Sequence, residues 1–92
     1  MIEAAADCLR ITVPMTLANA TALREQGDAL LDKELPFDFT AVTEVDSSAL
    51  AVIFAWQRNA QSQGKTLRLS SLPANLLSLA SLYGVDDLLP AA

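Results

Sequence analysis

Three consecutive residues, Asp46, Ser47 and Ser48, place carboxylate and hydroxyl groups between an apolar extended segment and an apolar helical one. Asp and Ser are preferred at the starts of helices, so spacing alone favours a structural N-cap here. The first turn of a helix also points unpaired N–H groups outward, which would orient a hydroxyl at Ser47 for a partner protein or for phosphoryl transfer. We therefore expect the Ser47 hydroxyl to be exposed at a helix start.

The other reactive residue types argue against catalysis. The chain has no histidine. This excludes a Ser-His-Asp triad, a Cys-His dyad and any metal site with a histidine ligand from this chain. The adjacent carboxylates Asp86 and Asp87 follow Gly84, and this favours a solvated turn over a shared-proton catalytic dyad. Cys8 is the only cysteine and is predicted to be a small buried hydrophobe. We expect no enzyme activity, no metal and no cofactor.

Composition restricts the partners further. The 92 residues suit a single domain over residues 1–92. A formal charge of −5 with six Lys or Arg disfavours nucleic acid, because that binding depends on releasing counterions from phosphates. The longest apolar run, Ala49 to Trp56, is far below the roughly 20 residues that span a bilayer. The first residues have neither the basic start nor the long apolar centre of a secretory signal, so we expect none here. We expect a cytoplasmic protein without direct membrane insertion.

Strands must hold the Asp46-Ser47-Ser48 turn in place, and period-two alternation predicts them. Leu9 to Val13 alternates and is predicted to pair as a hairpin with Ile2 to Ala5. Phe37 to Thr40 alternates with both phenylalanines on one side, which indicates a central strand. Thr66 to Leu69 alternates in the same way and is predicted to be the last strand.

Three helices are predicted from apolar residues at helical spacing. The first begins at one of three possible caps and ends near Asp32; those caps are Thr16, Asn19 and Thr21. The second covers Ser47 to Gln63 and ends at a left-handed Gly64. The third opens at Pro73 and runs through Tyr83. Trp56 and Tyr83 share helical register with other apolar residues, so both are predicted to pack in the core rather than to anchor an interface.

This order of elements predicts an α/β fold. Strand, strand, helix, strand, helix, strand, helix implies a mixed, mostly parallel sheet with an N-terminal hairpin and right-handed crossovers. The helices are expected to cover mainly one face of that sheet.

The segment FDFTAVTEVDSSAL, Phe37 to Leu50, resembles the signature of STAS domains, the family named for sulfate transporters and anti-sigma factor antagonists. That signature is a strand, Asp, Ser or Thr, a small residue, Gly and Leu. Ser47 stands at the hydroxyl position, Asp46 at the acidic position before it, and Ser48 and Ala49 at the small positions. Ala49 replaces the customary Gly, and its methyl group is expected to narrow the surface beside Ser47.

The resemblance implies a non-catalytic regulatory domain with the STAS fold. The ending LLSLASLYGVDDLLP is similar to a stand-alone branch that binds the ATPase subunit of an ABC-type phospholipid transport complex at the inner face of the cytoplasmic membrane. This implies docking through the Asp46-Ser47-Ser48 helix start.

The family resemblance also implies an alternative, an anti-sigma factor antagonist. Its unmodified Ser47 would bind an anti-sigma serine kinase, and phosphorylation would release it. A phosphate would add about −1.5 to −2 charges at pH 7. The helix dipole would favour that charge while Glu44 and Asp46 oppose it, so we expect modification to alter an interface more than the fold.

Overall fold

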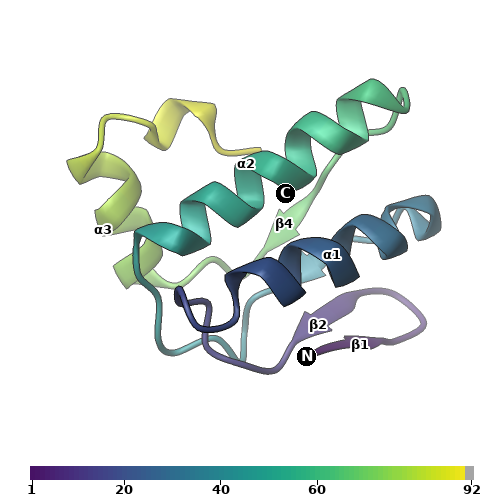
Figure 1. The fold of residues 1–92 in the computed structure, drawn as a ribbon, viewed down its shortest axis with the longest axis horizontal. Helices are drawn as coiled ribbons and strands as arrows, with labels where there is room; N and C mark the ends of the chain where they lie inside the picture. Colours follow the sequence, from purple (N-terminus) through teal and green to yellow (C-terminus); the bar gives the residue numbers. More distant parts are fainter. Residues whose placement is uncertain (91–92) are drawn as a thin grey trace.

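Four short strands and three helices make up the fold of residues 1–90, the part of the chain that the computed structural model describes (Figure 1). The strands are β1 (Ile2–Ala4), β2 (Leu9–Ile11), β3 (Phe37–Asp38) and β4 (Leu69–Ser70). The helices are α1 (Ala20–Leu30), α2 (Ser47–Ser62) and α3 (Ala74–Leu82). Single 3-10 turns, η1 (Leu31–Lys33) and η2 (Asp86–Leu88), follow α1 and α3.

The strands form one mixed sheet in the order β1-β2-β3-β4. β1 and β2 are an antiparallel hairpin in which Ile2 lies opposite Ile11. The pairs β2–β3 and β3–β4 are parallel. The predicted α/β class, N-terminal hairpin and mostly parallel sheet are therefore confirmed.

Helices α1 and α2 lie side by side over one face of the sheet (Figure 1). Leu9 and Ile11 of β2, Phe37 of β3 and Phe39 directly after β3 are buried in one core with residues of these helices. Trp56 of α2 completes this layer, with its ring stacked on that of Phe37 at a centroid separation of 4.4 Å. The predicted core positions of these residues are confirmed.

Gly27 lets α1 approach α2 closely. A Cβ atom at Gly27 would lie 2.2 Å from Cε2 and Nε1 of Trp56, so a larger residue would overlap a buried ring. Trp56 Nε1 also donates a hydrogen bond to the carbonyl oxygen of Arg24 at 3.2 Å. The contact between Gly27 and Trp56 and the hydrogen bond from Trp56 to Arg24 together fix the position of α1 relative to α2.

Two predictions of burial are wrong. Tyr83 is 57% exposed, because α3 contacts the core through Leu76 and Ala80 and ends before Tyr83, which is its C-cap. Cys8 is half-buried rather than buried, because it lies in the turn just before β2. Desolvation and the neighbouring Asp7 carboxylate raise the pKa of the Cys8 thiol, which disfavours the reactive thiolate.

Candidate functional site

Asp46 caps α2 and ties it to the loop that follows β2. Its backbone is extended, and Oδ1 accepts a hydrogen bond from the amide of Ser48 at 2.8 Å. Oδ2 accepts a second one from the amide of Leu17 at 3.0 Å. These bonds, that of Leu17 first, lower the pKa of Asp46, because they stabilise the ionised carboxylate. The N-cap follows the sequence prediction, whereas the bond to Leu17 joins residues 29 positions apart.

The backbone beside Asp46 extends the contact between these two loops. Met15 and Val45 form a parallel bridge. The Met15 amide donates to the Glu44 carbonyl at 3.0 Å, and the Asp46 amide donates to the Met15 carbonyl at 3.3 Å. The start of α2 is thus held by backbone and side-chain bonds together, and this makes it a rigid platform.

Ser47 is exposed and is the first residue of α2. None of the hydrogen bonds among residues 1–90 uses its hydroxyl, so this group remains free to bind a partner. Ser48 is half-buried, and its amide is bonded to Asp46. Ala49 is 1% exposed, so its methyl group packs in the core and does not narrow the surface beside Ser47. Two helical residues are about 200° of rotation, so Ala49 and Ser47 lie on nearly opposite sides of α2.

An apolar hollow of about 280 Å³ adjoins Ser47. Leu50 and Phe54, one and two turns further along α2, line it together with Tyr83 and Val85 from the end of α3. Leu17, whose amide is bonded to Asp46, is 77% exposed, and Tyr83 adds a half-exposed ring. We call Leu17, Ser47, Phe54 and Tyr83 the Ser47 surface.

Sequence reasoning missed the apolar part of this surface. Leu17 falls outside the periodic pattern of α1, and that isolation was a usable signal of exposure. The sequence prediction did end the third helix at Tyr83, directly before Gly84, but it took the helical register of Tyr83 as a sign of burial.

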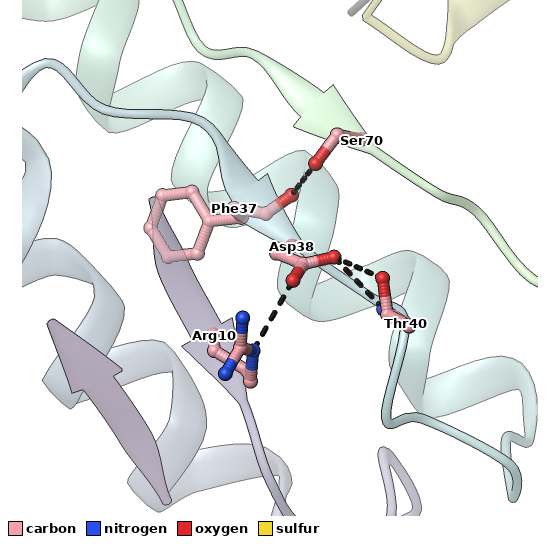
Figure 2. Close-up of polar contacts among 5 residues, drawn as sticks. All are labelled: Arg10, Phe37, Asp38, Thr40 and Ser70. Carbon is pink, nitrogen blue, oxygen red and sulfur yellow. Dashed lines mark hydrogen bonds and ion pairs between the residues drawn. The ribbon is translucent and has the colours of Figure 1, made fainter. Parts of the chain in front are cut away.

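The face of the sheet without α1 and α2 carries a polar row. In the strand register Glu3 lies opposite Arg10, Arg10 opposite Asp38 and Asp38 opposite Ser70. Figure 2 shows Asp38 at the centre: its carboxylate accepts from Arg10 Nε at 3.3 Å and from both the amide and the hydroxyl of Thr40. The bonds from Thr40 are the main cause that lowers the pKa of Asp38, and Arg10 adds to them. This network holds strand register.

Residues 1–90 show neither a metal-binding cluster nor a membrane-spanning helix. No group of three His, Cys, Asp or Glu side chains in that range is arranged to hold a metal ion. No helix there has both the length and the apolar character needed to cross a membrane.

A mixed sheet covered by helices, with an exposed serine at the start of the central helix, defines a STAS-type domain. The chain belongs to the STAS family described as "Mlab, STAS domain", whose profile matches residues 2–90. The predicted STAS resemblance is thereby confirmed, and so is the branch, which is that of the lipid asymmetry maintenance protein MlaB. No curated protein matches the sequence.

Solved structures share the fold at low sequence identity. A Thermotoga maritima protein assigned as an anti-sigma factor antagonist is 19% identical, with a TM-score of 0.74 over 99% of this chain and 83% of its own. SpoIIAA, an anti-sigma factor antagonist, is 12% identical in its unphosphorylated form, with a TM-score of 0.65 over 100% of this chain and 86% of its own. The phosphorylated form of Bacillus SpoIIAA is 11% identical, with a TM-score of 0.67 over 100% of this chain and 89% of its own. These similarities establish the fold alone.

Proposed function

We propose that this chain is a non-catalytic regulatory subunit that binds the ATPase subunit of an ABC-type phospholipid transport complex. In this proposal it works in the cytoplasm, at the inner face of the membrane, and docks through the Ser47 surface. The MlaB-like family match supports the choice of partner. The observation that carries docking is the exposed Ser47 hydroxyl beside the apolar hollow.

The composition of the Ser47 surface suits a protein interface. Interface centres are enriched in aromatic residues and depleted in charge, and Tyr83 has the size to act as an anchor. The hydroxyl of Ser47 supplies a polar group that orients the contact. Because Asp46 holds both α2 and Leu17, little conformational freedom is lost on binding, and this favours affinity.

A second candidate is an anti-sigma factor antagonist switched by phosphorylation of Ser47. The exposed position of the Ser47 hydroxyl, free of hydrogen bonds within residues 1–90, favours it. A phosphate on Ser47 would find the Ser48 amide already bonded to Asp46, and the ionised Asp46 would repel it. Modification would therefore change the docking surface and leave the fold intact, as a binding switch requires.

Calorimetric binding to the purified ATPase subunit tests the proposal. We expect Tyr83→Ala to weaken binding at least tenfold, because it removes the anchor, and Ser47→Asp to weaken it through added charge. Ser47→Ala should bind within a few-fold of the unmodified chain. Leu77→Ala is the matched control, since Leu77 is an exposed α3 residue that does not line the hollow.

Measuring the unmodified chain and the same variants against an anti-sigma serine kinase as well as the ATPase separates the two candidates, because the candidates differ in which partner is bound. The anti-sigma alternative predicts that Ser47→Ala binds a serine kinase and that Ser47→Asp does not. No detectable binding of the unmodified chain to the ATPase, combined with that kinase pattern, would replace the first candidate by the second. Equal ATPase binding by Tyr83→Ala and Leu77→Ala would remove the Ser47 surface from the interface.

A further inference from the structure

A second hollow lies between α1 and α2 and shares no lining residue with the hollow beside Ser47. Its volume is about 260 Å³. Small and apolar side chains form its floor, and an arginine stands on each helix. The floor residues are Ala20 of α1 and Ala51, Val52 and Ala55 of α2, and the arginines are Arg24 and Arg58.

Both arginines are exposed, and no carboxylate among residues 1–90 forms an ion pair with either of them. The one ion pair in that range is Arg10 with Asp38, on the opposite face of the sheet. In a chain of net charge −5, this groove is therefore a local site of free positive charge. Exposed guanidinium groups bind carboxylates with paired hydrogen bonds.

The groove is also held in shape. Arg24 contributes its backbone carbonyl to the hydrogen bond from Trp56, one turn from the Gly27 contact that sets the spacing of the helices. The backbone of Arg24 is thus fixed relative to α2. The alanine floor leaves room for another polypeptide backbone to approach.

We propose that the α1–α2 groove is a second docking site, which binds an acidic peptide segment of a partner protein. In such a segment two carboxylates pair with Arg24 and Arg58, and a small apolar side chain between them rests on the Ala51 and Ala55 floor. The charges are complementary, and the size of the hollow suits side chains rather than a whole domain.

Other anions fit this groove less well. An anionic membrane surface is contacted by clusters of four to eight basic residues, and a chain of charge −5 is repelled by it. Inorganic phosphate favours backbone N–H donors at a helix terminus, and Ala20 and Thr21 do open α1, but phosphate has no group that contacts the apolar side chains of the groove. A peptide alone uses both the arginines and the apolar floor.

Nuclear magnetic resonance titration of the full-length chain with a synthetic peptide tests the proposal without any ATPase. The probe is an alanine-based peptide with glutamates four residues apart, and its glutamine analogue is the control. We expect amide shifts at Ala20, Thr21, Arg24, Ala55 and Arg58 with the glutamate peptide, and at least tenfold weaker binding with the glutamine peptide.

Charge-reversal variants complete the test. Arg24→Glu/Arg58→Glu should lose at least tenfold in affinity for the glutamate peptide. Lys33→Glu/Lys65→Glu changes the net charge equally outside the groove and should stay within twofold. Equal losses in both variants, or no shifts at the groove, would overturn the proposal. So would shifts caused instead by inorganic phosphate or by phosphatidylglycerol vesicles. ATPase binding is measured separately, so either proposal can fail alone.

Discussion

Gly27→Ala tests the close crossing of α1 and α2. The new Cβ would lie 2.2 Å from two atoms of the Trp56 ring, so the indole must move. Forcing extra volume into a packed core costs about 1 to 3 kcal/mol, and losing the hydrogen bond to Arg24 costs about 1 kcal/mol. The higher helix propensity of alanine returns about 1 kcal/mol. We expect the free energy of unfolding to fall by about 2 kcal/mol, which lowers Tm by about 8 to 16 °C.

Circular dichroism during thermal and urea unfolding measures this loss, and two further variants isolate its cause. Ala29→Gly, at an exposed position of the same helix, measures the propensity effect alone. In a Trp56→Phe background, where the smaller ring can yield, Gly27→Ala should be neutral or stabilising. A Tm that is unchanged or raised by Gly27→Ala in the original background would refute the reasoning, because the ring would then move without cost.

Two predictions concern the carboxylates. The lowered folded pKa of Asp38 means that its ionised form stabilises the fold above the unfolded pKa of about 3.9, and that this contribution is lost as pH falls through the folded pKa. In urea unfolding, Asp38→Asn should therefore have a lower free energy of unfolding than the unmodified chain at pH 7, and the difference should be smaller at pH 3. An equal difference at the two pH values would contradict this. Asp46→Ala should speed hydrogen exchange at the Leu17 and Ser48 amides, which lose their acceptor, while β2 keeps its protection. Unchanged exchange at Leu17 would disprove the inference that Asp46 holds this loop against α2.

Local periodicity was sufficient to predict the packed elements. Phe37 and Phe39 alternate into the core, and Trp56 lies on the buried side of α2, as their spacing indicates. Gly64 has φ of +69°, so the left-handed helix end was readable from residue type. The start of α1 could not be read in this way, because three residues near its start are equally suitable N-caps by residue type. Asn19 takes the position, yet its side chain bonds to the Pro14 carbonyl instead of capping.

Only those features of the candidate site that depend on residues adjacent in the sequence could be predicted. Capping by Asp46 and exposure of Ser47 depend on the residues beside them. The bond from Leu17 to Asp46 depends on how two loops align across the sheet, and the exposure of Tyr83 depends on where α3 leaves the core. No short-range pattern encodes the bond between the two loops, whereas Gly84 marks the helix end beside Tyr83 without showing which way the ring faces. The burial of Ala49, in contrast, follows from helix geometry and could have been anticipated.

The polar row from Glu3 to Ser70 has a consequence for assembly. Stacking another molecule on that face would strip water from the Arg10–Asp38 pair, a desolvation cost that new contacts seldom recover. That face is therefore poorly suited to stacking, whereas both hollows described above are lined by the helices and the turn after α3. Docking through the helices alone would give an assembly one preferred orientation of this chain.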